Sequence, residues 1–524
     1  MQYVSGGYRS ERGLHSDEAA HLLNGVLLRD YLRDGIGQNP MEFARTFYSH
    51  YPKIAPLVWP PLFHVVLGLA LLLGGAPNET AQVLLALCTS WIAYRLFSVV
   101  ALISSRTTAA AVVAILLSTP GVLELSTSVM LDIVVAATTF EAAWWLGRFA
   151  DTGRTGHAVA FGFMTALACL TKGNGLSAVL APFVLLALGR IDLLWRPGLY
   201  VAAAMVAVGA GPFLGLALYF GDSGDFAAAT PAMMSYRLGY YGLYVWKQLG
   251  PAATLLGLVG VAVMVTGRSS LSPPLRASAL AFVALVGGAG LFHVLNPHVI
   301  PDGRYFALAL PPLLVLAALG VTEAARLLVS GGRARGALAA TALLLVAAEH
   351  VVAARHLSAQ PPLGYRAVMA FLAEETGLTG RRLLVVSNEH GEGAGVVEAA
   401  VLGLRPAPTI LRGSKLLASD DWMGRNFRLH FETPEAILGA LEARQVDYVV
   451  LDGAPAARKL PYWPLVHALV TSRSDRFQLV LDRSVDAVAG PLRPLAVYRL
   501  CADGGTCSMS RPARPATGLP PIEP

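Results

Sequence analysis

Ten runs of mostly apolar residues fill the first two thirds of the sequence and constrain the fold more than any other feature. They cover residues 80–104, 107–124, 131–149, 157–171, 175–189, 198–220, 251–267, 277–295, 304–321 and 336–354. A helix that crosses a bilayer needs about 20 apolar residues, and most of these runs approach that length. Only 14% of the residues are charged, whereas a soluble domain carries about 25%. The chain is therefore neither an ordinary soluble enzyme nor a disordered protein.

Charged and turn residues return after residue 354 and continue to the C-terminus. Helical patterns at 364–376, 394–403 and 434–444 alternate there with strand patterns at 383–387, 447–452, 478–482 and 495–499. We therefore expect an all-α polytopic membrane domain at 80–354 and a soluble α/β domain with a flexible tail at 355–524. The segment HGEGAG (390–395) lacks the G-x-G-x-x-G spacing, so we interpret it as a tight turn rather than a nucleotide site.

Cationic residues are distributed unequally between the two sets of alternating loops. The richer set holds Arg106, Arg148, Arg154, Arg190, Arg196, Arg268, Arg276, Arg326, Arg333 and Arg335, and the poorer set holds Lys172, Arg237, Lys247 and Arg304. Cytoplasmic loops carry the excess of Lys and Arg, so the richer set is predicted to be cytoplasmic. The poorer set and the α/β domain then lie outside, at the inner (plasma) membrane of a bacterial cell envelope. No basic stripe interleaved with aromatic residues indicates nucleic-acid binding.

Two segments before the ten runs need separate interpretation. Residues 57–75 are apolar enough to span, but we favour an interfacial or re-entrant helix that keeps residues 1–56 on the outer side. Nothing in residues 1–56 could act as a signal or an anchor. We therefore expect a further helix upstream of Met1, lost through a late start or a fragment.

The first candidate for chemistry is the acidic pair Asp17–Glu18. Ser16 is a suitable N-cap for an amphipathic helix over 17–34, which is predicted to lie on the bilayer surface. Both acids then lie in its first turn, where the helix dipole favours the ionised carboxylate. Such a carboxylate can accept a proton from an acceptor hydroxyl. The alternative is that the pair only complements the dipole.

The other candidates are charged residues at the outer ends of the apolar runs. Asp132 is either functional or paired, because an acid at membrane depth is costly. Lys172, in a glycine-rich break, could meet a phosphate or extend to the interface. Arg304 could bind a phosphate or pair with Asp302, and Lys53 is a further outer cation. Glu141 is interpreted as the structural partner of Arg95.

The histidines and cysteines carry weaker signals. His15, His21, His50 and His64 match no zinc-binding spacing, so they are predicted to be solvated or interfacial. Cys501 and Cys507 could form a disulfide if the tail is extracytoplasmic, or remain free thiols.

Several motifs occur in one order along residues 10–325. They are HSDEAAHLLNGVLLRDYL, YPKIAPLVWPPLFHVVLGLALLLGG, SVMLDIV, LTKGNGLSAVLAP and DGRYFALALPPLL. This series resembles the GT-C fold glycosyltransferases that use polyprenyl-phosphate sugars, a family-39-like group. The group includes the protein O-mannosyltransferases, the aminoarabinose lipid A transferases and the galacturonosyl-to-lipopolysaccharide transferases. Its helix upstream of the acidic pair is the one missing here.

The resemblance assigns roles to matching residues. It implies Asp17 as the catalytic base, with Glu18 and Asp132 also catalytic, and Lys172 and Arg304 at the donor phosphate. Tyr305 and His21 belong to the acceptor or donor pocket. The acids and cations are expected to converge on one common pocket on the outer side of the membrane. Many family members have Lys-Pro-Pro where this chain has Trp59-Pro60-Pro61, so we assign the remaining phosphate contact to Lys53.

The function implied is inverting transfer of a sugar from a polyprenyl-phosphate donor to an envelope lipid, glycan or protein acceptor, among membrane lipids. No cofactor is required by the resemblance, although the paired acids could hold a divalent metal ion. The competing prediction is a multi-span transporter or lipid flippase. Transporters commonly contain internal repeats with broken helices at matching positions, and the sequence shows one break, at 171–174, without a counterpart.

Overall fold

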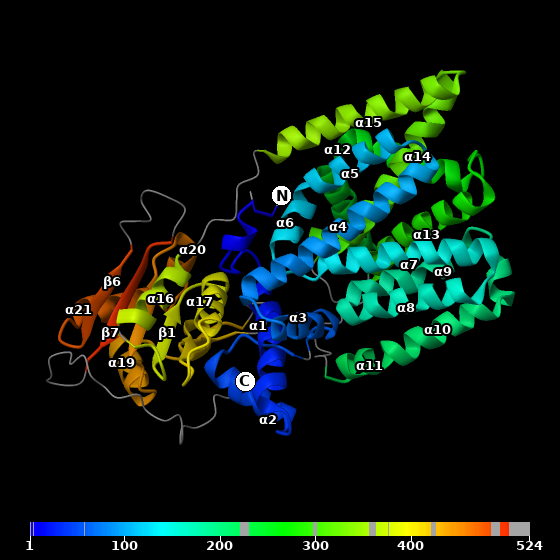
Figure 1. Cartoon of the computed structure of the whole chain (residues 1–524). Coiled ribbons are helices and arrows are strands. Elements are labelled where there is room, and N and C mark those ends of the chain that lie inside the picture. Colours follow the sequence, from blue (N-terminus) through cyan, green and yellow to red (C-terminus); the bar gives the residue numbers. More distant parts are fainter. Residues whose placement is uncertain are drawn as a thin grey trace. The chain divides into compact units, whose positions relative to one another are not determined.

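The computed structural model divides the chain into two compact units, which are described separately (Figure 1). The described residues are 2–3, 5–56, 58–220, 230–296, 301–355, 363–375, 377–420, 426–483 and 493–501. The first unit comprises Met1–Ser5, Pro56–Phe63 and Gln82–Ser358. The second comprises Gly6–Ala55, His64–Ala81 and Ala359–Pro524. The predicted flexible tail lies outside the described residues.

The first unit is helical throughout its described residues. Its elements are α4 (Pro77–Ile103), α5 (Arg106–Ser118), α6 (Pro120–Thr127), α7 (Asp132–Thr152), α8 (Thr155–Thr171), η3 (Gly173–Gly175), α9 (Leu176–Ala187), η4 (Ile191–Trp195), α10 (Pro197–Gly209), α11 (Gly211–Phe220), α12 (Pro231–Val265), α13 (Pro273–Leu295), η6 (Gly303–Ala309), α14 (Leu310–Leu328) and α15 (Gly332–Ala354). Helices α7, α8, α9 and α13 lie alongside one another (Figure 1). A Cβ added at Gly147 of α7 would lie 2.4 Å from the Ser278 Cα of α13, so the two helices approach at backbone distance.

The ten predicted spans coincide largely with these helices, but three differ in shape. Five helices of the described residues are long and apolar enough to cross a membrane, or up to seven if each bent pair is one span. The predicted spans 107–124 and 198–220 are bent pairs, with angles of 64° and 49° at the break. The predicted span 251–267 is only the second half of α12, which is kinked at Gly250, where φ is +71°. The interior Pro251 lacks the N–H that would continue the helix.

The second unit begins with helices that surround the acidic pair. They are α1 (Glu18–Asp30), the π-helical turn η2 (Tyr31–Gly35), α2 (Pro40–His50) and α3 (Leu62–Leu72), whose first two residues belong to the first unit. Helix α3 has 11 residues and is about 16 Å long, too short to cross a bilayer alone. Its interfacial or re-entrant placement stays a prediction.

Two predictions about α1 are wrong. Ser16 is not its N-cap; Asp17 occupies that position without a side-chain cap hydrogen bond. The helix is also not a one-sided surface helix, because His21 and Asn24 on its polar side are buried as fully as Leu22 and Leu23. It packs instead against α3, where a Cβ on Gly25 would lie 2.6 Å from the Leu67 side chain.

The remainder of the second unit is the predicted α/β domain. Its helices are α16 (Tyr365–Glu375), α17 (Glu389–Val401), α18 (Gly413–Leu416), α19 (Pro434–Ala443), α20 (Pro455–Arg458) and α21 (Trp463–Ser472). Its strands are β1 (Arg382–Val386), β2 (Thr409–Arg412), β3 (Ala418–Ser419), β4 (Arg428–Leu429), β5 (Tyr448–Asp452), β6 (Phe477–Asp482) and β7 (Leu495–Leu500). The five-stranded sheet has the order β2-β1-β5-β7-β6. Strands β2, β1 and β5 are parallel, and β7 and β6 are antiparallel.

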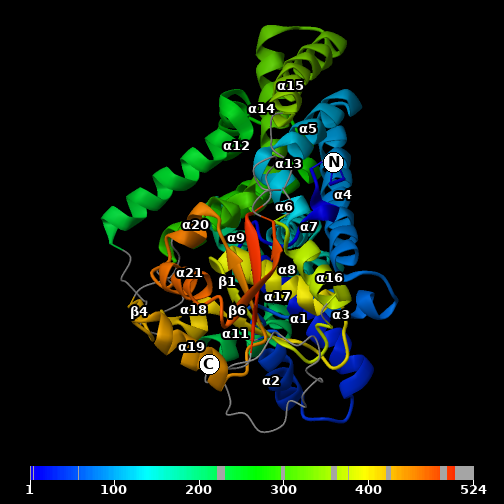
Figure 2. The same cartoon turned by 90° about the vertical axis from the view of Figure 1, so that its left-hand side faces the viewer.

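Helices cover both faces of this sheet, with α16 and α17 on one face and α19 and α21 on the other (Figure 2). Every residue of β5 is buried, as expected for a central strand of a covered sheet. The tight turn predicted at HGEGAG is wrong, because these residues form the first turns of α17, which Asn388 caps by accepting from the Gly391 N–H. Strand β2 and the β3–β4 hairpin were not predicted. Cys501 is disulfide-bonded, and Cys507 lies outside the described residues.

Candidate active site

A buried ion pair forms the centre of the polar site in the first unit. Asp132 is the first residue of α7, and Lys172 is the C-cap of α8. The Lys172 Nζ donates to both carboxylate oxygens of Asp132, at 2.7 and 2.8 Å. The two side chains are 12% and 1% exposed. The helix dipole of α7 further stabilises the ionised carboxylate. The structure therefore supports the paired interpretation of Asp132, whose partner is the candidate phosphate-binding cation. A catalytic role for Asp132 stays a prediction.

A second cation, Arg304, also lies close to the Tyr305 ring. Lys172 Nζ is 4.5 Å from the ring centroid, and the Arg304 guanidinium carbon is 5.2 Å from it. Arg304 also pairs with Asp302 at 2.6 Å, the partner predicted from the sequence. The Asn174 amide donates to the Tyr305 carbonyl at 3.0 Å and fixes η6 beside η3. Cations are attracted to the face of an aromatic ring, so Tyr305 holds two positive charges close together.

An apolar cavity of about 420 Å³ lies in the same unit, between α12, α13 and α14. Tyr241, Val245, Leu249, Phe306 and Leu313 are among its lining residues. Phe306 directly follows Tyr305, and Tyr241 stacks on Phe306 with a centroid separation of 5.2 Å. One lining residue of the cavity is therefore the sequence neighbour of Tyr305, whose ring both cations approach.

The acidic pair lies in the second unit, and its two members have different surroundings. Glu18 is fully buried, and its Oε2 accepts from the Leu14 and His15 N–H groups at 2.9 and 3.3 Å. Glu18 thus folds the loop that precedes α1. Asp17 is partly exposed, and its backbone carbonyl accepts the His21 N–H at 3.0 Å. Of the two carboxylates, Asp17 is therefore the better placed to exchange a proton with a substrate.

Lys53 belongs to the same unit as Asp17. Burial, with a smaller contribution from the nearby Arg412, lowers the pKa of Lys53 to about 8. The carboxylates of Glu392, Glu389 and Asp17 oppose this shift. A Cβ on Gly393 would lie 3.5 Å from Lys53 Cε and 3.1 Å from Ala19 Cβ, so Lys53 and the start of α1 meet at the same glycine of α17.

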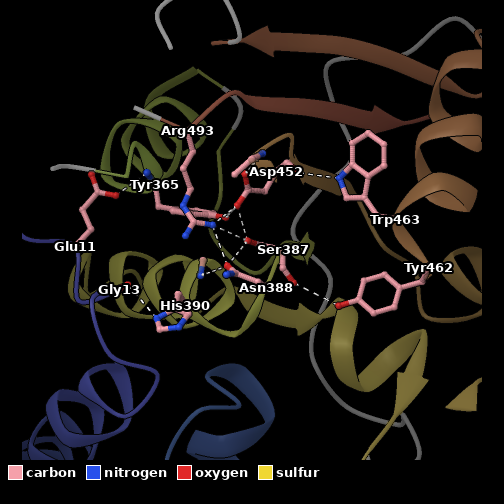
Figure 3. Close-up of polar contacts among 12 residues, drawn as sticks. Glu11, Gly13, Tyr365, Ser387, Asn388, His390, Asp452, Tyr462, Trp463 and Arg493 are labelled. Atoms are coloured by element: carbon pink, nitrogen blue, oxygen red, sulfur yellow. Dashed lines mark hydrogen bonds and ion pairs between the residues drawn. The ribbon is translucent and has the colours of Figure 1, made fainter. Parts of the chain in front are cut away.

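The loop before Asp17 is tied to the carboxyl edge of the sheet (Figure 3). Glu11 accepts the Tyr365 N–H at 2.7 Å, and the Gly13 carbonyl accepts from His390 Nδ1 at 3.2 Å. Beside these contacts lies a buried network centred on Asp452, the last residue of β5. Its Oδ2 accepts from Ser387, Arg493 and Tyr365 at 2.5, 2.5 and 3.1 Å. This network lies where the strand order of the sheet reverses, which is the usual ligand-binding crevice of doubly wound domains. In this protein it anchors the loop that precedes Asp17, because Tyr365 contacts both Asp452 and Glu11.

The structure thus brings together Asp132, Lys172, Arg304 and Tyr305. Asp17, Glu18, His21 and Lys53 belong to the other unit, and the convergence of the two groups stays a prediction. The prediction of solvated or interfacial histidines is wrong for two of them. His21 and His64 are buried, and His21 Nδ1 lies 3.1 Å from His64 Nε2.

Two ion pairs and one network bear on the sequence predictions. The Glu141–Arg95 pair is confirmed. The Asp132–Lys172 pair and the Asp452 network were missed, because they depend on which helices and strands are neighbours, which no local pattern specifies. Among the described residues, no three His, Cys, Asp or Glu side chains form a group that could hold a metal ion.

Comparisons with known proteins give the class of the fold. The family model for dolichyl-phosphate-mannose-protein mannosyltransferase matches residues 58–215. The crystal structure of ArnT from Cupriavidus metallidurans bound to undecaprenyl phosphate is 14% identical, with a TM-score of 0.54, and the match covers 98% of this chain and 97% of that one. Its apo form is 13% identical, with a TM-score of 0.54 and 95% coverage of both chains. The oligosaccharyltransferase of Archaeoglobus fulgidus, tethered to an acceptor peptide, is 12% identical, with a TM-score of 0.49 over 82% of this chain and 64% of that one. A search of curated proteins by sequence gives no match.

The chain therefore has the GT-C glycosyltransferase fold, as the order of its motifs indicated. The predicted fold class, a polytopic helical domain followed by a soluble α/β domain, is confirmed.

Proposed function

We propose that this protein is a membrane glycosyltransferase that uses a polyprenyl-phosphate-linked sugar. The acceptor is an envelope lipid, glycan or protein, and the reaction takes place on the extracytoplasmic side of the plasma membrane. The observation that carries the proposal is that two cations, Lys172 and Arg304, lie 4.5 and 5.2 Å from the ring centroid of Tyr305, which is next in sequence to Phe306 of an apolar cavity. A charged phosphate joined to a long hydrocarbon tail needs both features next to each other.

The two cations would act on the leaving group. As the acceptor oxygen bonds to the anomeric carbon, the bond from that carbon to the phosphate oxygen breaks and its electron pair leaves with the phosphate. Lys172 and Arg304 stabilise the growing negative charge in a partly buried setting, where such groups are worth more than in water. Asp132 holds Lys172 in position through both oxygens. The polyprenyl chain occupies the cavity lined by Tyr241 and Phe306.

Asp17 would act on the acceptor. Its carboxylate takes the hydroxyl proton while the acceptor attacks from the face opposite the phosphate, so the configuration at the anomeric carbon is inverted. Glu18 keeps the loop folded through the Leu14 and His15 N–H groups. Lys53 provides a further positive charge for the donor phosphate when its amine is protonated.

A matched pair of variants tests this division of roles. Asp17→Asn removes the base and should lower transfer from a labelled polyprenyl-phosphate sugar by about 10²–10⁴-fold. Glu18→Gln keeps an oxygen that can accept the two N–H groups, so it should retain most of the activity. The assay follows release of free polyprenyl phosphate by purified full-length protein in liposomes, which a transporter would not produce. Full transfer by Asp17→Asn, or equal losses in both variants, would remove Asp17 from the role of base.

A further inference from the structure

A second cavity lies at the opposite end of the helical unit from the Asp132–Lys172 pair. It has a volume of about 370 Å³, and its lining residues include Asp151, Arg190, Arg196 and Arg276. Asp132 and Asp151 are both on α7 and 19 residues apart, which corresponds to about 28 Å along the helix. The volume falls within the range of small-ligand sites, about 300–1,000 Å³. None of its lining residues has a part in the proposed transfer reaction.

Two of the arginines are fixed in place by the end of α7. Arg196 donates to the Phe149 and Ala150 carbonyls at 3.0 and 3.1 Å, and Arg190 also donates to the Ala150 carbonyl. Both are also paired with Asp192, at 2.9 Å for Arg190 and 2.7 Å for Arg196. Arginine side chains can bond the last carbonyls of a helix, and these contacts position the two guanidinium groups at the cavity.

The third arginine, Arg276, has guanidinium N–H groups that are available to a ligand. Within the part of the chain that the structure describes, the Arg276 guanidinium has no hydrogen bond or ion pair. It lies over Gly267, where an added Cβ would be 2.9 Å from Nη2. Arg276 comes from the first turn of α13, where the helix dipole favours an anion. A planar guanidinium in this position is suited to bidentate binding of a phosphate.

The segment between Arg190 and Arg196 carries the features of a membrane interface. In η4, Ile191 and Trp195 are 59% and 84% exposed, and the exposed Tyr200 follows within one turn of α10. Trp and Tyr gather where the hydrocarbon meets the headgroups. These exposed residues are those expected at headgroup depth, and Leu188, Met264 and Leu280 give the cavity an apolar wall.

We propose that this cavity binds the phosphate headgroup of an anionic phospholipid, with Arg276 as its hydrogen-bonding ligand and Arg190 and Arg196 as further positive charges beside it. These arginines belong to the loop set predicted to be cytoplasmic, and basic pockets between helices on that side bind anionic lipid headgroups. The lipid would join the ends of α7, α10, α12 and α13, and so stabilise the bundle at a distance from the transfer site.

The test measures retention of phosphatidylglycerol by full-length protein with native mass spectrometry. The first variant is Arg276→Gln, because loss of Arg190 or Arg196 would also disrupt the end of α7. Its affinity should be about 10- to 100-fold weaker, as expected for losing hydrogen bonds to a charged group. Arg333→Gln is the matched control, because Arg333 is an exposed arginine at the same end of the bundle but outside the cavity. It should bind as the wild type does.

Two further measurements separate the alternatives. Lys172→Met, altered at the transfer site, should still retain phosphatidylglycerol. Phosphatidylcholine with the same acyl chains should bind much more weakly. Equal losses in Arg276→Gln and Arg333→Gln, or equal binding of the two lipids, would overturn the proposal. Displacement of the lipid by inorganic phosphate at millimolar concentration would instead assign the cavity to a soluble anion.

Discussion

The ion pair between Lys172 and Asp132 allows a test that distinguishes the effect of a substitution on protein stability from its effect on sugar transfer. Lys172→Met leaves Asp132, which is 1% exposed, without its partner. Breaking a buried pair by removing one member costs about 3–5 kcal/mol, because the remaining charge is uncompensated. The dipole at the N-terminus of α7 stabilises the remaining carboxylate and offsets part of this cost. We therefore expect the free energy of unfolding to fall by about 3 kcal/mol, near the lower limit of that range. The double variant Asp132→Asn/Lys172→Met removes both charges and should recover most of that stability.

The two readouts are the apparent free energy of unfolding, from denaturant titration in detergent micelles, and sugar transfer from the labelled lipid donor. Both variants should lose transfer by at least about 10²-fold, the usual cost of removing one group that stabilises a developing negative charge. Arg95→Met, which breaks the buried pair with Glu141, is the control for stability alone. A Lys172→Met protein as stable as the wild type would refute the burial argument. A double variant with full transfer would refute the assignment of Lys172 to the phosphate.

Three further predictions concern residues of the second unit, one of them together with Asp302 of the first unit. Lys53 has a pKa of about 8, so it is mostly protonated at pH 7 and loses its charge as the pH rises through 8. The KM for the donor should therefore increase above that pH, and Lys53→Arg should move this increase to higher pH; a KM that is flat from pH 7 to 9 would exclude Lys53 from donor binding. Cysteines placed at Asp17 and Asp302 should both react with an impermeant thiol reagent added from outside. Reaction at 302 without reaction at 17 would contradict the predicted common pocket. Asp452→Ala should destabilise the α/β domain by about 3–5 kcal/mol, because Arg493 is left without its buried partner. Limited proteolysis of the C-terminal domain measures this loss, and unchanged resistance would contradict it.

Prediction from the sequence worked best for elements that are encoded by a long run of neighbouring residues of one kind. Apolar runs located nearly all the helices of the first unit, because burial in lipid requires about 20 consecutive residues of one kind. Strand β5 was located because all of its residues are buried on both faces of the sheet. The same reasoning failed at HGEGAG, where three glycines suggested a turn but Asn388 caps a helix. It also failed at α1, where burial on all sides replaced the expected polar face.

Some partners of the candidate residues were likewise predicted from the sequence, and others were not. Arg304 and Asp302 are two positions apart, and their pairing was one of the two alternatives predicted for Arg304. Glu141 was expected to pair with Arg95 in a neighbouring span. The Asp132–Lys172 pair depends on how α7 packs against α8, and the Asp452 network depends on which strands are neighbours.

The sequence by itself determined the class of the chain, the order of its elements and the residue types available for phosphate and proton chemistry. It did so because hydrophobic length and charge are properties of contiguous residues. Only the tertiary structure decided that Lys172 is held by Asp132, that Glu18 is enclosed by its own loop, and that three arginines share a cavity at the far end of α7. Those relations arise from helix and strand packing between distant segments, which no local pattern specifies.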